Sequence, residues 1–233
     1  MIPEKRLARI AGVLYLAVAI FGGFAELVVR DGIVETGNAA ATAESIRGSA
    51  TLFRWGFASD LVQATIFLFT AMTLYLLLRH VNELVARAMV VIVAVAVAII
   101  CLNLLNQYVA LQVATGEAAS GSAGTDALAG LFADMHVAGY LIAQIFFGLW
   151  LLPLGYLVYR SGYFPKVLGV LLAVGCVGYL VDTFAHFLVP ELAGSIEPIV
   201  VAPAAVGEIG FVIYLLVKGV RLPSRPALVP AAA

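Results

Sequence analysis

Polar side chains that could bind ions or small molecules lie within long apolar runs of this sequence, where such groups are uncommon. Successive membrane spans run in opposite directions, and with this alternation the polar groups fall toward the same end of the protein. They are Glu26, Asp60, Asn103, Gln107, Asp134, His136, Asp182 and His186. A charge placed in lipid is unfavourable unless it is paired, hydrated or close to the interface. We therefore expect either a wet rim at this end of the protein or a polar pocket that opens there.

Glu208 differs from these groups because it falls near the middle of the last apolar run, far from either interface. Pro203 precedes it and removes the hydrogen bond that would reach the carbonyl of Ile199, which favours a kink. Gly207 and Gly210 flank it, so a neighbouring backbone can approach closely. This pattern predicts a deep carboxylate at a functional site, with a structural, hydrogen-bonded glutamate as the alternative.

Spacing brings some of the polar groups onto shared helix faces. Asp182 and His186 stand at positions i and i+4, as do Asn103 and Gln107. With His136, the pair Asp182 and His186 would offer the nitrogen and oxygen ligands that zinc and iron accept.

Two histidines, His136 and His186, would also suffice for a haem. The sequence nevertheless lacks HExxH, CxxCH and GxSxG motifs. We therefore predict no cofactor, and we favour a binding role over an enzyme.

The composition requires a lipid environment for the elements that carry these groups. Hydrophobic residues make up 63% of the chain and charged residues 12%, whereas soluble domains are about a quarter charged. The net charge of -1 argues against a nucleic-acid partner. Cys101 and Cys176 each lie inside an apolar run, so we expect two reduced core residues.

Six apolar runs are each long enough to cross a bilayer, which takes about 20 residues. They cover residues 8–29, 55–79, 84–113, 128–159, 165–189 and 198–218. We predict an all-α membrane protein, a single six-helix bundle over residues 1–221 with a disordered tail at 222–233. A cleavable signal peptide is the alternative for the first run, but that run is long for one and five more follow. Asn38 is expected to cap a short surface helix, and Asp126 to cap the fourth span.

The basic residues predict the orientation of the bundle. Ten of the 13 lysines and arginines fall on the side of the two termini, and Arg30, Arg47 and Arg54 fall on the other. Because cytoplasmic loops are enriched in lysine and arginine, both termini should be cytoplasmic.

The stretch FGLWLLPLGYLVYRSGYFPKVLG at residues 147–169, followed by GYLVD at 178–182, resembles the DUF4386 family of bacterial integral membrane proteins. The opening RIAGVLYL at 9–16, the LFR at 52–54, the pair Gly207-Glu208 and the KGV at 218–220 are similar too. The resemblance implies a multi-helix domain in the bacterial cytoplasmic membrane. It brings no established activity.

These observations lead to three functional hypotheses. The first is an outward-facing polar pocket that binds or moves a small solute or a proton, with Glu208 deep inside and Glu26, Asp60, Asp182 and His186 at its mouth. Asn103, Gln107 and His136 would be further pocket residues. The alternatives are a metal-dependent membrane hydrolase and a structural membrane protein without a small-molecule site.

Overall fold

The computed structural model describes residues 3–118 and 124–221, and every regular element within these ranges is helical. The elements are α1 (Glu4–Gly23), η1 (Phe24–Arg30), α2 (Asp31–Ile33), α3 (Ala39–Gly48), α4 (Ala50–Leu78), α5 (Glu83–Ala114), α6 (Thr125–Arg160), α7 (Lys166–Leu188) and α8 (Pro190–Val217). Six stretches are long and apolar enough to cross a membrane, counting Glu4–Ile33 as one. The predicted all-α fold with six candidate spans is therefore confirmed. The tail at 222–233 lies outside the described residues.

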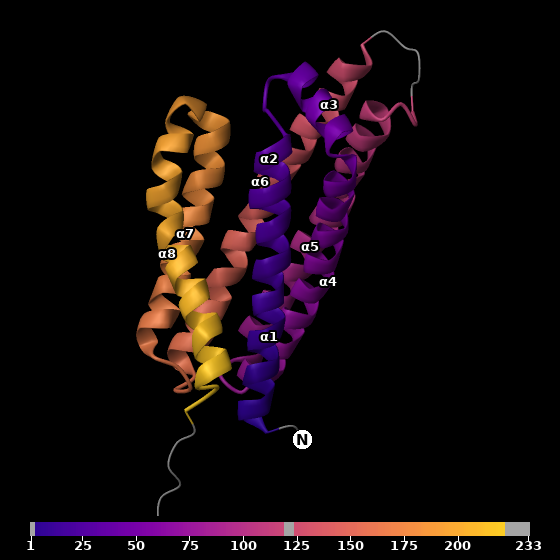
Figure 1. Ribbon diagram of the computed structural model, residues 1–233. Helices are drawn as coiled ribbons and strands as arrows, with labels where there is room; N and C mark the ends of the chain where they lie inside the picture. Colours follow the sequence, from indigo (N-terminus) through magenta and orange to yellow (C-terminus); the bar gives the residue numbers. More distant parts are fainter. Residues whose placement is uncertain (1–2, 119–123, 222–233) are drawn as a thin grey trace, which may run out of the picture.

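The helices form two parts that meet at one end of the bundle (Figure 1). One part is the hairpin of α7 and α8, and the other is the group of helices around α4. α4 packs against α1 and α5, and α6 packs against α5 and α7. The hairpin of α7 and α8 leans away from α1 over much of its length and returns to it near the start of α1 and the end of α8. We call this the terminal end of the bundle, and the opposite one the far end, which α3 covers beside α5 and α6.

Glycines allow the close packing of α6, α7 and α8. A Cβ atom added to Gly155 of α6 would lie 2.6 Å from the carbonyl oxygen of Gly169 in α7. One added to Gly178 would lie 1.9 Å from the carbonyl oxygen of Val200 in α8. Since lipid tails are as apolar as side chains, membrane helices associate through such close backbone contacts. Two of these glycines belong to the 147–169 motif, which thus has a packing role.

A π-helical segment changes the direction of side chains at the far end of the first span. Residues Phe24–Arg30 form η1, in which the wider turn shifts later residues around the helix axis. As a result Arg30 is buried, with 6% of its surface exposed. The sequence interpretation placed Arg30 in the loop that follows the first span, and the structure corrects this because the helix continues to Ile33.

Several local predictions can be compared directly with the structure. Asn38 caps α3 as expected, and its side chain accepts a hydrogen bond from the backbone N–H of Ala41. The capping role predicted for Asp126 is wrong: Gly124 occupies the N-cap, and Asp126 pairs with Arg47 at 2.6 Å. Cys176 is buried as predicted, but Cys101 is exposed on the outside of α5.

The sixth span begins earlier than the sequence pattern suggested. α8 starts at Pro190 and keeps Pro198 and Pro203 within the helix. Proline suits the first turn, where no partner is needed for its nitrogen. Pro203 lies five residues before Glu208 and removes the backbone hydrogen bond to the carbonyl of Ile199.

Candidate functional site

A cavity of about 500 Å³ lies near the middle of the bundle, between the two parts of the fold. Its volume is in the range of small-molecule sites, about 300–1,000 Å³. Five helices contribute to its wall, which consists of Tyr15, Leu16, Val18, Ala19, Gly22, Gly23, Gln63, Phe67, Tyr140, Phe147, Trp150, Tyr179, Ala205, Glu208, Ile209, Val212, Ile213 and Leu216.

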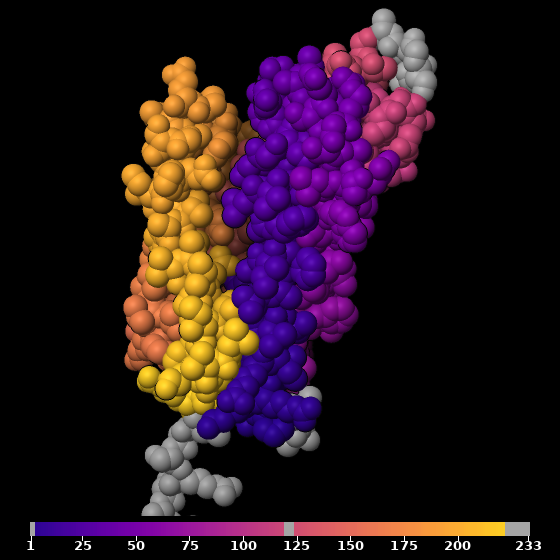
Figure 2. Space-filling model, viewed as in Figure 1, coloured from indigo at the N-terminus to yellow at the C-terminus, as the bar shows by residue number. Residues whose placement is uncertain are grey.

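The cavity opens sideways between α1 and α8. Figure 2 shows a groove between the indigo α1 and the yellow and orange hairpin of α8 and α7. Leu16, Ile209 and Ile213 line the cavity and are also exposed on the outside of the bundle. Because both helices are apolar enough to cross a membrane, this opening lies on a surface suited to contact lipid.

Glu208 is the one charged residue in this wall. The hydroxyl of Tyr15 in α1 donates a hydrogen bond to its Oε2 atom. The hydroxyl of Tyr179 in α7 donates to its Oε1 atom at 3.2 Å. The carboxylate is thus held by two phenols from other helices, and no lysine, arginine or histidine of the cavity wall offers it a positive charge.

A series of aromatic rings runs along the cavity wall. The ring centroids of Tyr15 and Trp150 are 5.4 Å apart, and those of Trp150 and Phe67 are 5.0 Å apart. The series continues from Phe67 to Phe147 at 6.0 Å and from Phe147 to Tyr140 at 5.6 Å. These separations are typical of stabilising aromatic pairs. The rings make the wall rigid as well as apolar.

Gln63 of α4 adds a second polar group to the cavity wall. Its side chain is buried, and its Oε1 atom has no hydrogen-bond partner. It packs against Gly22 of α1, where an added Cβ atom would lie 3.4 Å from Cγ of Gln63. A buried amide oxygen without a partner is unusual in folded proteins. Gln63 thus gives the cavity wall a buried amide whose oxygen has no hydrogen-bond partner in the described structure.

A separate polar cluster forms around Arg30, nearer the far end. Its Nη2 atom lies 2.6 Å from Oε2 of Glu26, and its Nη1 atom lies 3.4 Å from Oδ2 of Asp60 and 2.6 Å from Nε2 of His136. The guanidinium also stacks on the ring of Tyr140, 4.3 Å from its centroid. One buried cation thus joins two acids, one histidine and one ring, and Tyr140 separates it from the cavity.

Both ring nitrogens of His136 have partners in this cluster. A guanidinium can only donate, so Nε2 accepts from Arg30 and the proton sits on Nδ1, 3.3 Å from the carbonyl oxygen of Asn103. Asn103 in turn donates to the carbonyl oxygen of His136 at 2.8 Å. The structure does not bring the predicted metal set of His136, His186 and Asp182 together, because His136 lies in the Arg30 cluster, where both of its ring nitrogens have partners.

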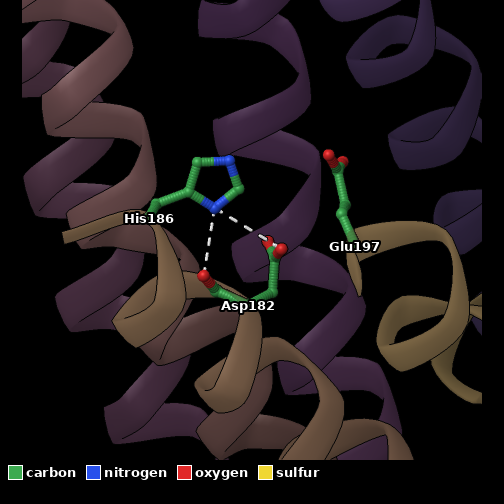
Figure 3. A group of neighbouring side chains, drawn as sticks. All are labelled: Asp182, His186 and Glu197. Carbon is green, nitrogen blue, oxygen red and sulfur yellow. Dashed lines mark hydrogen bonds and ion pairs between the residues drawn. The ribbon is translucent and has the colours of Figure 1, made fainter. Parts of the chain in front are cut away.

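The structure instead brings Asp182 and His186 close to Glu197 of α8 (Figure 3). One ligand atom from each lies within 4.8 Å of the others. Nδ1 of His186 is 3.0 Å from the carbonyl oxygen of Asp182 and 3.5 Å from its Oδ1 atom. Oδ2 of Asp182 accepts a hydrogen bond from Gln144 at 2.6 Å, whereas buried Oδ1 has no hydrogen-bond partner.

The structure distributes the candidates of the sequence analysis over several places. Glu208 lines the cavity. Glu26, Asp60, Asn103 and His136 belong to the network of Arg30, and Asp182 and His186 form the group with Glu197. Gln107 lines a smaller pocket between α4 and α5. The expected mouth of acids around Glu208 is therefore not found among the residues that line its cavity.

Sequence reasoning missed the two tyrosines that hold Glu208 and the free amide of Gln63. A signal for Tyr15 was present, since Tyr15, Ala19 and Gly22 follow helical spacing on one face of α1. Tyr179 stands within the GYLVD segment, although its type alone gave no indication of its partner.

Comparison with known proteins gives a family but no activity. A family model described as a domain of unknown function, DUF4386, matches residues 10–219. An uncharacterized protein of Archaeoglobus fulgidus is 38% identical over 81 residues, which cover 35% of this chain and 46% of that protein. The chain thus covers about half of that relative. No solved structure matches.

Proposed function

Because the chain belongs to the DUF4386 family, whose description assigns no function, we propose a function from its cavity: it is a membrane protein that binds a small solute beside Glu208. The observation that carries the proposal is a carboxylate without a basic partner in the wall of a cavity of about 500 Å³. A charge that only stabilised the fold would be expected to meet a cation, as Asp60 does.

The proposal includes the place of the protein in the cell. We propose a bacterial cytoplasmic membrane, with the terminal end of the bundle in the cytoplasm. The basic residues support this, because those of the described chain lie mainly at the terminal end. Glu208 would then lie near mid-membrane, where a solute or a proton would be exchanged during transport.

The binding proposal is tested with the detergent-purified protein and a panel of amines, carboxylates, sugars and neutral aromatics. We expect at least one class to raise the unfolding temperature of the native protein and to have no effect on Glu208→Gln. Glu191→Gln is the matched control, because Glu191 is an exposed acid on the same helix and outside the cavity. Equal stabilisation of the Glu208→Gln variant would remove Glu208 from the site.

A second candidate function is a divalent metal centre formed by Asp182, His186 and Glu197. The observation that favours it is the buried Oδ1 atom of Asp182, which has no hydrogen-bond partner and belongs to a residue of this group of ligands. Three such ligands leave positions for water, as in zinc hydrolases.

Elemental analysis after purification with added zinc and desalting tests this second candidate. We expect about one equivalent of zinc in the native protein and a loss of it in Asp182→Asn. Asp31→Asn, at an exposed acid of α2, should keep the metal. Zinc far below one equivalent in the native protein would refute the metal centre.

A further inference from the structure

We infer that the ligand of the Glu208 cavity is a hydrophobic organic cation, such as an amine or ammonium ion with an apolar body, and that it enters from the bilayer between α1 and α8. This inference rests on the proposed function, because it names the ligand class of the same cavity. Three features of the cavity carry it: the charge, the rings and the opening.

The charge of the wall selects the sign of the ligand. Glu208 is its one charged residue, and its two hydrogen-bond partners are neutral phenols. An anion beside this carboxylate would be repelled at short range and in an apolar medium, where electrostatic interactions are strong. A cation would supply the positive charge that the wall lacks. Arg30 does not reverse this preference, because Glu26 and Asp60 neutralise it behind the ring of Tyr140.

The aromatic rings favour a large, weakly hydrated cation. Six aromatic side chains line the cavity: Tyr15, Phe67, Tyr140, Phe147, Trp150 and Tyr179. A cation within about 6 Å of a ring centroid is attracted to the face of the ring, and this recurs in sites for quaternary ammonium ligands. A small metal ion needs about six oxygen ligands instead. The wall offers too few, since most of its remaining residues are apolar.

The remaining polar group agrees with this ligand class. Gln63 lines the same cavity as Glu208, and the Oε1 atom of its buried amide has no hydrogen-bond partner. A protonated amine carries N–H donors that can reach an amide oxygen as well as a carboxylate. A ligand with only acceptor groups could donate a hydrogen bond to neither of them.

The opening indicates how such a ligand arrives. Leu16, Ile209 and Ile213 line the cavity and are exposed on the outside of α1 and α8, and all three are apolar. The groove between these two helices is visible in Figure 2. A molecule with an apolar body partitions into the bilayer and is concentrated beside this groove. Lateral entry therefore lets the ligand keep its apolar part out of water throughout.

The test compares three probes of similar shape and different charge: tetraphenylphosphonium, triphenylphosphine oxide and tetraphenylborate. Binding to the full-length, detergent-purified protein is measured by calorimetry. We expect the cation to bind at least about tenfold more tightly than the neutral probe, and the anion not to bind. Glu208→Gln should reduce the affinity for the cation to that for the neutral probe, whereas Glu191→Gln should leave it unchanged.

A second variant keeps the inference testable if Glu208→Gln does not fold. Phe147→Leu keeps an apolar side chain and removes a ring from the wall. It should reduce the affinity for the cation several-fold more than the affinity for the neutral probe.

The possible failures are distinguishable. Equal affinities of the cation and the neutral probe in the native protein would overturn the cation inference and leave solute binding intact, provided that Glu208→Gln still alters some ligand of the panel. Cation binding that neither variant changes would place the probe elsewhere and overturn the inference. Binding of no probe and no panel compound would overturn both proposals.

Discussion

Asp60 and Glu208 are two acids within the spanning helices, and their surroundings stabilise them in different ways. Asp60 is almost completely buried and pairs with Arg30, which also binds Glu26. Glu208 faces a cavity and is held by two tyrosine hydroxyls. In the first arrangement the charge of the acid is neutralised by an arginine of the protein. In the second the acid lines a cavity and has no basic partner in the cavity wall. This difference separates a structural network from the cavity at which we propose ligand binding.

At the residue scale, the structure predicts that Arg30 is essential for stability. Arg30→Met would leave Asp60 buried without its cation, and breaking a buried pair in this way costs about 3–5 kcal/mol. The free energy of unfolding can be measured by chemical denaturation of the purified protein. Arg54→Met is the control: Arg54 and its partner Glu117 are both exposed, so the loss should be below about 1 kcal/mol.

A rescue experiment separates the loss of the ion pair from a loss of packing. Neutralising both acids in Arg30→Met, by Glu26→Gln and Asp60→Asn, should restore part of the stability, because no unpaired charge then remains. If the triple variant is less stable than Arg30→Met alone, the cluster does not act through charge compensation.

At the scale of helices, glycines at contact points determine how closely α7 and α8 approach. Gly178 faces the backbone of α8, and an added Cβ atom would overlap the carbonyl of Val200. Gly194 lies in α8 with nothing within 4 Å of its Cβ position. The hairpin thus contains two glycines of opposite character, which allows a matched comparison.

We predict that Gly178→Ala destabilises the protein and Gly194→Ala does not. The backbone of α8 must move to accept the methyl group at position 178, and overpacking of this kind typically costs about 1–3 kcal/mol. At position 194 alanine should be neutral or stabilise by up to about 1 kcal/mol, because it favours a helix over glycine. Thermal unfolding of the two variants in one detergent compares them. A similar decrease in both would show that the close approach of α7 and α8 contributes little.

The spans could be predicted from the sequence, but the directions of their side chains could not. Hydrophobic length alone indicates six helices, because each must cross the same thickness of lipid. Glu208 was identifiable because its depth follows from its place in the span. The burial of Arg30 could not be predicted, because the wider turn of η1 rotates its side chain into the bundle. The residues of η1, FAELVVR, contain no pattern that predicts such a turn. Counting along the spans placed Asp60 and Asp182 together in one polar layer, whereas the structure places Asp60 with Arg30 and Asp182 with His186 and Glu197. The count gives no information about which way a side chain faces.

At the scale of the whole molecule, the polar sites are ordered along the bundle. The cavity lies near the middle, the Arg30 cluster lies nearer the far end, and the group of Asp182, His186 and Glu197 lies at the far end of α7 and α8. The two parts of the fold diverge over this same region (Figure 1). The side on which the terminal end lies therefore decides from which compartment each polar site is approached.

The distribution of positive charges predicts that the terminal end faces the cytoplasm, and the structure shows which of the basic residues are paired with acids. The basic residues of the far end are all paired with acids: Arg30 with Glu26 and Asp60, Arg47 with Asp126, and Arg54 with Glu117. The basic residues at the terminal end of the described chain are Lys5, Arg6, Arg9, Arg79, Arg87, Arg160, Lys166, Lys218 and Arg221. Of these, Arg87 alone forms an ion pair, with Glu83. An excess of lysine and arginine is typical of the cytoplasmic side, which is the basis for the proposed orientation.

Single cysteines test this orientation in a variant without the native ones, Cys101→Ser with Cys176→Ser. Thr36→Cys places a thiol on an exposed loop at the far end, and Pro3→Cys places one at the exposed start of α1. In bacterial spheroplasts, a membrane-impermeant maleimide should label Thr36→Cys at once and Pro3→Cys only after lysis. The reverse pattern would show that the terminal end faces the outside. The compartment from which we propose that Asp182 and Glu208 are approached would then be reversed as well. Labelling of both thiols before lysis would contradict the single span, Glu4–Ile33, that separates the two positions. The lateral opening between α1 and α8 is independent of this outcome, because a ligand that enters from lipid can reach it in either orientation.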